Sequence, residues 1–311
     1  MAIPIAAVEQ TPIDWEVPEQ QIGLWSDAWT RFRRNRLAVA GLSLVIFLIV
    51  IALVSPILVK LGVLIDPFTQ RVESIETGPG INGHVMGTDI LGRDTLSRLM
   101  IGSEVSLTVG LLVQGIIFPI GLAIGLTAGY FGGRIDNLLM RFTDIWYAFP
   151  DLLFVLVVVS VWHLDGPWYI QLIPIFGAIA LVNWVGLARL VRGQVLSIKE
   201  KEYIEAARSS GSPPLKLILK HLLPNSLGPI IVTLTFGIPQ AIFLEAVLSF
   251  LGVGIQPPQP TWGQMVFDGY EAIYANPSGV VFPALAIGFT LLAFTFIGDG
   301  LRDALDPRMR R

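Results

Sequence analysis

The sequence has no cysteine and few charged residues. Without cysteine the chain forms no disulfide bond, and it has no thiolate that could act as a nucleophile or a metal ligand. Only 14% of its 311 residues are charged and 53% are hydrophobic, a composition far from that of ordinary soluble domains. The net charge of -3 is too small to indicate a nucleic-acid partner. The composition therefore predicts a membrane protein.

The usual signatures of catalysis are also missing. The sequence has no glycine-rich loop ending in Gly-Lys-Ser or Gly-Lys-Thr, which would cradle the phosphates of ATP. It also has no nucleophile elbow and no His-Glu-x-x-His zinc motif. We therefore predict that the chain is not an enzyme and has no catalytic residue, cofactor or metal of its own. Any energy for its work must come from another chain or from an ion gradient.

Six predominantly apolar runs predict transmembrane helices, because about 20 helical residues cross a bilayer. The runs cover residues 37–58, 105–131, 145–162, 168–187, 229–251 and 280–297. The predicted fold is an all-α integral membrane protein. It has an N-terminal cytoplasmic segment at 1–36, a transmembrane domain at 37–300 and a cytoplasmic tail at 301–311.

The distribution of lysine and arginine predicts the orientation. With the N-terminus in the cytoplasm, 17 of the 21 basic residues fall on the cytoplasmic side. The other four are Lys60, Arg71, Arg93 and Arg98. Basic residues concentrate in cytoplasmic segments of membrane proteins, so both termini are predicted to be cytoplasmic.

The polar segment at 197–225, between the fourth and fifth apolar runs, predicts a cytoplasmic helical hairpin. Ser197 and Glu200 have the spacing of a capping box that opens a first helix. Gly211 suits the left-handed residue that closes this helix. A second helix follows, and Pro224 is expected to limit how far it continues.

The hairpin resembles the EAA loop of ABC-importer permeases in residue type and in spacing. The matching positions are Glu205, Ala206, Ala207, Gly211, Leu223 and Pro224. A second stretch, 84–98, is similar to the one before the second span in the smaller permease subunit of peptide-type importers. The resemblance extends over nearly the whole chain and implies a type I ABC importer permease fold.

The resemblance also implies a function and a set of partners. The chain would be half of the translocation pathway of an ATP-driven importer in a bacterial or archaeal cell membrane. Its partners would be a second, homologous permease, two ATPase subunits that use ATP and Mg, and an extracytoplasmic binding protein. The six hairpin positions would contact an ATPase subunit. Peptides are the favoured cargo, and nickel complexes, glutathione-like peptides and oligosaccharides remain open.

Polar residues inside apolar runs are candidates for the substrate path, because they are costly in a bilayer. The two carboxylates are Asp151, beside Pro150, and Glu245. The amide candidates are Gln114, Asn183 and Gln240, although amides also join helices to one another. An ion-coupled secondary transporter that uses Asp151 and Glu245 as proton carriers is the alternative function.

A polar segment between the first two runs contains His84, Asp89 and Asp94. Metal ligation is one interpretation of these residues. One histidine and two aspartates in a glycine-rich turn are weak evidence for a metal site, and such turns are commonly held by side-chain hydrogen bonds. The pattern therefore favours a structural loop.

Overall fold

The structure is a computed structural model that describes residues 23–162 and 164–306. Most of the predicted N-terminal segment 1–36 and part of the predicted tail 301–311 lie outside the described residues. The described part is helical and contains no β-strand beyond two isolated bridges. The prediction of an all-α fold is therefore confirmed.

Five helices are long and apolar enough to cross a membrane, or six if the bent pair α4 and α5 counts as one span. The helices, in chain order, are α1 (Leu24–Arg34), α2 (Arg36–Lys60), α3 (Thr95–Phe131), α4 (Gly133–Tyr147), α5 (Asp151–Val161), α6 (Trp168–Lys199), α7 (Glu202–Ser209), α8 (Pro214–Leu217), α9 (Leu223–Phe250), α10 (Trp262–Glu271) and α11 (Ser278–Leu305), with a short 3-10 helix at Val72–Ser74 and a π-helical turn at Ile218–Leu222.

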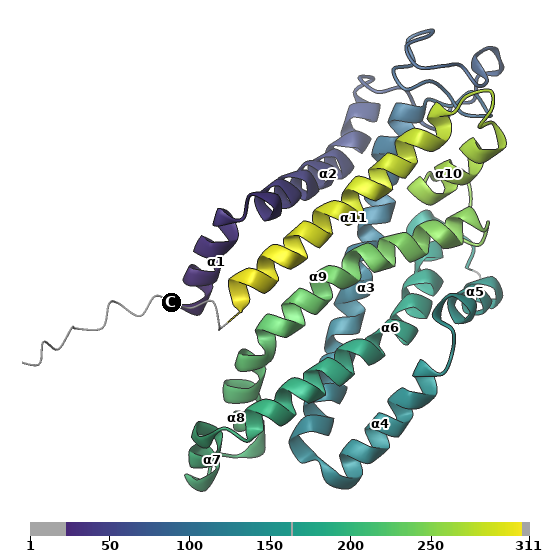
Figure 1. Ribbon diagram of the computed structural model, residues 1–311. Helices are drawn as coiled ribbons and strands as arrows, with labels where there is room; N and C mark the ends of the chain where they lie inside the picture. The colour runs from purple at the N-terminus through teal and green to yellow at the C-terminus, as the bar shows by residue number, and fades with distance from the viewer. Residues whose placement is uncertain (1–22, 163, 307–311) are drawn as a thin grey trace, which may run out of the picture.

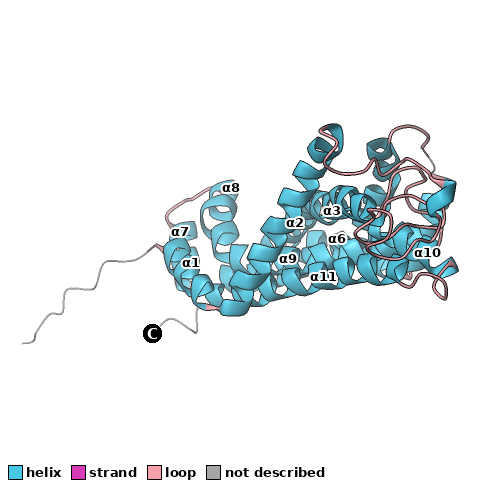
Figure 2. Ribbon diagram, turned by 90° about the horizontal axis from the view of Figure 1, so that it is seen from above, coloured by secondary structure: helices cyan, strands magenta, loops and turns pink. Residues whose placement is uncertain are grey.

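The long helices run between two chemically different ends of the molecule (Figure 1). The loop between α2 and α3 lies at one end together with α10, and α1, α7 and α8 lie at the other, which Figure 2 also shows. The arginines of α1 and the basic residues of α7 and α8 are therefore at the same end. This is the end that the sequence predicts to be cytoplasmic.

The centre of the bundle is the close packing of α3 against α6. Gly121, Gly125 and Gly129 recur every fourth residue along α3 and face α6. A Cβ atom at Gly125 would lie 2.6 Å from the carbonyl oxygen of Ala188, too close for any side chain. Small residues at this spacing let two membrane helices approach until their backbones nearly touch. Helices α3 and α6 are therefore closely packed along this stretch.

The predicted span at 145–162 is not one helix. Helix α4 ends at Tyr147, α5 begins at Asp151, and their axes differ by 78°. Pro150 has no N–H to donate and disfavours helical geometry at Phe149. Asp151 therefore begins a new helix just after a sharp bend beside Pro150.

The hairpin differs from its prediction at both ends. The capping box at Ser197 and Glu200 does not open a helix, because α6 continues to Lys199 and α7 begins at Glu202 without a side-chain cap. Gly211 does close α7, with a φ of 78°. The amides of Gly211 and Ser212 donate to the carbonyls of Arg208 and Ala207, which together form a Schellman motif.

Pro224 does not end the second helix of the hairpin. The π-helical turn at Ile218–Leu222 precedes it, and helical geometry continues from Pro214 through Phe250. The amide of Leu223 donates to the carbonyl of Ile218, five residues earlier. This wider turn shifts the hydrogen-bond register before the proline, where a regular helix would be expected to kink or break. The hairpin is therefore joined to the membrane span by one continuous rod.

Candidate functional site

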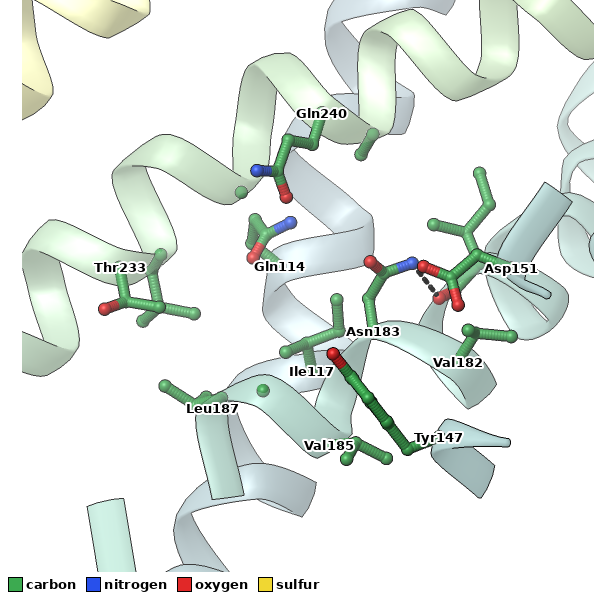
Figure 3. A pocket seen from close by; sticks show the side chains of 15 residues that line it. Gln114, Ile117, Tyr147, Asp151, Val182, Asn183, Val185, Leu187, Thr233 and Gln240 are labelled. Carbon is green, nitrogen blue, oxygen red and sulfur yellow. Dashed lines mark hydrogen bonds between the residues drawn. The ribbon is translucent and has the colours of Figure 1, made fainter. Parts of the chain in front are cut away.

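A cavity of about 210 Å³ lies where α3, α6 and α9 meet the bend between α4 and α5 (Figure 3). It is lined by Gln114, Ile117, Tyr147, Asp151, Ile179, Val182, Asn183, Val185, Gly186, Leu187, Thr233, Leu234, Gly237, Gln240 and Ala241. Four of the five residues predicted for the substrate path are in this set, although they come from four different helices. They are Asp151, Gln114, Asn183 and Gln240.

The polar groups of the cavity are amides and two hydroxyl groups around one carboxylate. Asp151 is the only acidic residue in the lining, and its side chain lies beside that of Asn183 in Figure 3. The Nδ2 atom of Asn183 donates to the carbonyl oxygen of Ile179 at 2.9 Å, which fixes the orientation of this amide. Gln114 and Gln240 present further amide groups from α3 and α9. The site can therefore bind both donors and acceptors of a polar solute.

Two glycines shape the cavity, and neither was predicted from the sequence to do so. A Cβ atom at Gly237 would lie 2.5 Å from Oε1 of Gln114, so glycine makes room for that side chain. Gly186 faces open space, with no atom within 4 Å of a Cβ atom built on it. In a sequence, a glycine within an apolar run indicates close helix packing. Only the three-dimensional arrangement distinguishes Gly186 and Gly237 from glycines that serve packing alone.

Tyr147 is another lining residue that sequence reasoning missed. The guanidinium group of Arg189 lies 4.5 Å from the centre of its ring, and Nη2 of Arg189 lies 2.6 Å from Oδ1 of Asp144. A cation over an aromatic face is attracted to it. Nearer the hairpin, Arg192 forms a bidentate pair with Asp136. These contacts join α4 to α6 on the cytoplasmic side of the cavity.

Glu245 lies outside the cavity. Its side chain is fully buried and accepts a hydrogen bond of 2.7 Å from the Oγ atom of Ser249. The hydroxyl groups of Ser106 and Thr261 lie beside the same carboxyl group. Of the two interpretations, a place in the path or a bond to neighbouring helices, this geometry favours the second.

The hairpin presents an unusual surface for its position. Ile204, Leu217 and Leu222 are buried and anchor it to the bundle. In contrast, Leu215 is 67% exposed and Leu219 is 53% exposed. Apolar side chains this accessible on a polar segment are a feature of surfaces that bind another protein.

The residues matched to the EAA pattern lie on α7, in the turn that follows it, and at the start of α9. Glu205 and Ala206 are exposed, and Ala207 is half-buried. Gly211 turns the chain between the two helices. Leu223 and Pro224 lie at the junction with α9.

The loop between α2 and α3 is held by ion pairs and hydrogen bonds. Nδ1 of His84 lies 2.8 Å from Oδ1 of Asp94, and Oδ2 of Asp94 accepts from the amide and the hydroxyl of Ser97 at the start of α3. Asp89 pairs with Arg93 at 2.6 Å. Within residues 23–162 and 164–306, no group of three histidine or acidic side chains could hold a metal ion. The geometry matches the structural-loop interpretation.

Asp268 of α10 closes this network from the far end of the chain. Its carboxylate lies 3.0 Å from Nη2 of Arg93 and 3.6 Å from Nη2 of Arg98. Burial raises the pKa of Asp268, and the guanidinium groups of Arg98 and Arg93 oppose that rise. The network fixes α10 to the start of α3. Trp262 adds to this contact by donating to the carbonyl oxygen of Leu99.

A bundle of membrane-spanning helices around a cavity lined by both apolar and polar side chains defines the class of the protein as a multi-pass transmembrane protein. The particular family follows from sequence comparison. Residues 121–311 match the family described as binding-protein-dependent transport system inner membrane component. Residues 23–73 match the N-terminal TM domain of oligopeptide transport permease C. The chain belongs to this family of ABC-importer permeases of the bacterial cell membrane.

Similar proteins match over almost the full length of the chain. The dipeptide transport system permease protein DppC of Bacillus subtilis is 42% identical, over 97% of this chain and 95% of the relative. The oligopeptide transport system permease protein OppC of Haemophilus influenzae is 42% identical, over 92% and 89%. The glutathione transport system permease protein GsiD of Pectobacterium atrosepticum is 37% identical, over 92% of both chains.

A solved structure supports the fold. A chain of the MetNI methionine ABC transporter, in an inward-facing conformation, has a TM-score of 0.51 and 19% identity. The match covers 68% of this chain and 97% of that chain. The type I importer permease fold is therefore confirmed.

Proposed function

We propose that the chain is the transmembrane permease subunit of an ATP-driven importer of di- or oligopeptides. In this proposal it forms half of the translocation pathway together with a homologous permease. Two ATPase subunits bind and hydrolyse ATP with Mg, and an extracytoplasmic binding protein delivers the cargo. This chain performs no catalysis of its own.

The observation that carries the proposal is the exposed apolar surface of the hairpin. Leu215 and Leu219 are more than half exposed at the end assigned to the cytoplasm, where burial in a partner would remove them from water. Glu205, exposed on α7 of the same hairpin, can form a charge-assisted hydrogen bond with a partner's arginine. The small Ala206 permits close approach of the partner surface. An ATPase cleft is the partner that fits an importer permease.

The continuous rod from α8 to α9 provides a route for coupling. Leu215 on the hairpin and Gln240 at the cavity are separated by 25 residues of helical chain. At 1.5 Å per residue this is about 38 Å. A displacement of the hairpin would move α9 as a unit and change the wall of the cavity, as in other rigid-body transitions.

Peptides fit the chemistry of the cavity. The carboxylate of Asp151 can pair with a peptide's terminal ammonium group, and the amides of Gln114, Asn183 and Gln240 can bond to peptide groups. The relatives are named as permease proteins of dipeptide, oligopeptide and glutathione transport systems, and glutathione is itself a short peptide. The cargo class is therefore peptides.

Co-purification with the ATPase subunits tests the proposal. We expect Glu205→Lys and Leu215→Ser to release the ATPases from the solubilised permease. Tyr274→Ala is the matched control, because Tyr274 is fully exposed and follows α10, which lies at the opposite end of the molecule from α7 and α8 in Figure 1. Retention of the ATPases by both hairpin variants would refute hairpin coupling.

Uptake measurements test the energy source separately. An ATP-driven importer continues to accumulate peptide when a protonophore is added and ATP is maintained. Loss of uptake under these conditions would support the alternative, an ion-coupled transporter with Asp151 as the proton carrier.

A further inference from the structure

Helix α1 has an apolar arc of which the protein covers only half. Ala28 and Phe32 are buried, and a Cβ atom at Gly300 of α11 would lie 3.2 Å from the Phe32 ring. The other half of the arc is formed by Trp25 and Trp29, which are 57% and 47% exposed. Two large indoles one turn apart are therefore left uncovered by the described residues.

Basic residues border the uncovered tryptophans. The guanidinium carbon of Arg33 lies 4.7 Å from the centre of the Trp29 ring. Arg34 and Arg36 are exposed just beyond it, at the junction with α2. We call Trp25, Trp29 and Arg33 the Trp–Arg face; Arg34 and Arg36 are further exposed cations at the same end of α1.

We propose that the Trp–Arg face binds the headgroups of anionic phospholipids in the cytoplasmic leaflet. Tryptophan is enriched where a membrane meets water, because its ring is apolar and its N–H is polar. Clusters of basic residues on the cytoplasmic side of a membrane helix attract anionic lipid. The face has both properties.

The position of α1 supports a lipid over a protein as the occupant. Asn35 separates α1 from α2 by a single extended residue, and its side chain caps the start of α2. The first exposed apolar residue of that span is Leu37, which is 58% exposed. The Trp–Arg face therefore continues directly into a surface that contacts the bilayer. An amphipathic helix in this position lies in the interface with its apolar side toward the acyl chains.

The absence of cysteine makes a direct test possible. Ser26 is exposed on α1 beside the tryptophans, and Ser26→Cys creates a single labelling site. The labelled full-length chain would be placed in phosphatidylcholine nanodiscs. One sample would contain brominated phosphatidylglycerol and the other the same mole fraction of brominated phosphatidylcholine. Both brominated lipids quench a fluorophore only at short range.

We expect stronger quenching by the brominated phosphatidylglycerol. A basic residue near an anionic surface is worth about a fivefold preference, so Arg33→Gln with Arg34→Gln should remove most of the difference. Lys216→Gln with Lys220→Gln removes the same charge from the hairpin and should leave the difference unchanged.

Other outcomes would overturn the proposal. Equal quenching by the two lipids would show that the face does not select anionic headgroups. A preference that survives the arginine substitutions would assign it to other residues. A label shielded from both lipids and from aqueous iodide would show that protein covers the face instead.

Discussion

Gly186 is the position where the cavity can be filled without disturbing its walls. It is exposed, it lines the cavity, and a Cβ atom built on it meets nothing within 4 Å. We expect Gly186→Phe to place an aromatic ring in the space that a cargo would use. The folded state should lose little stability, because phenylalanine is a somewhat better helix former than glycine and the Cβ atom meets no neighbour.

The size of the effect follows from the volume. The cavity of about 210 Å³ has room for several water molecules, so an aromatic ring placed in it takes up space that a cargo would need. A cargo in transit would then have to displace the ring or deform the wall. Overpacking of this kind costs about 1–3 kcal/mol. Such a cost slows transport about 5- to 150-fold.

The assay is uptake of a labelled dipeptide by membranes that contain the assembled importer, with thermal unfolding measured in parallel. Gly193→Phe is the matched control. Gly193 is on the same helix, is also exposed and has no atom within 4 Å of a built Cβ, but it does not line the cavity. We expect the control to keep both its uptake and its unfolding temperature.

Normal uptake by a folded Gly186→Phe protein would refute the assignment of this cavity to the pathway. Equal loss in both variants would also refute it, because the effect would then come from a bulky residue anywhere on α6. Only a selective loss at Gly186 supports the reasoning.

Three further predictions concern stability. Gly125→Ala should lower the free energy of unfolding by about 1–3 kcal/mol, because its Cβ would overlap the backbone of α6; Gly115→Ala on the same helix, with open space around it, should not. Asp94→Ala should cost about 2–4 kcal/mol through the lost cap of α3 and the unpaired His84. Asp66→Ala, which removes the hydrogen bonds of an exposed turn, should cost less, about 0.5–1.5 kcal/mol. Asp268→Asn should reduce the change of stability with pH in acidic solution.

The sign of the Asp268 prediction follows from its raised pKa. The folded protein holds this proton more tightly than the unfolded chain does, so the protonated carboxyl favours folding below its ordinary pKa of 3.8. That contribution is lost as the pH rises through the higher folded-state value. The difference in stability between wild type and Asp268→Asn should therefore change between pH 3.8 and the higher folded-state pKa. Thermal unfolding at a series of pH values measures this difference. A constant difference would contradict the assignment.

Equal unfolding temperatures for Gly125→Ala and Gly115→Ala would contradict the packing argument for α3 and α6. For the loop between α2 and α3, an Asp94→Ala protein as stable as Asp66→Ala would show that the buried pair of His84 and Asp94 adds nothing to stability. Both comparisons use thermal unfolding of the solubilised chain.

The apolar runs and the residue types at the hairpin were sufficient to predict the fold class and the family. Hydropathy reports which segments avoid water, and it does so whatever their tertiary contacts. The four cavity residues were predicted for a similar reason, since an amide or carboxylate in an apolar run stands out in the sequence. Glu245 stands out equally, but its burial beside Ser249 depends on helix packing that the sequence does not display.

Helix boundaries were harder to predict, because competing signals were close in energy. The capping residues at Ser197 and Glu200 were overridden by continued packing of α6, whose last turn buries Ile198. The burial of a side chain is also difficult to predict. Trp262 could have been expected at a membrane interface from its residue type alone, yet it is buried and its indole N–H donates to the carbonyl oxygen of Leu99.

The π-helical turn before Pro224 is the feature with the largest consequence for the proposed mechanism. A proline normally interrupts a helix, and an interruption here would leave the hairpin free to pivot without moving α9. The extra residue in the turn lets helical geometry continue into the span instead. Because π-turns arise from the register of backbone hydrogen bonds, residue patterns alone do not reveal them. In the proposed mechanism, the same local distortion that defeated the sequence prediction therefore lets a displacement of the hairpin move α9 and the wall of the cavity.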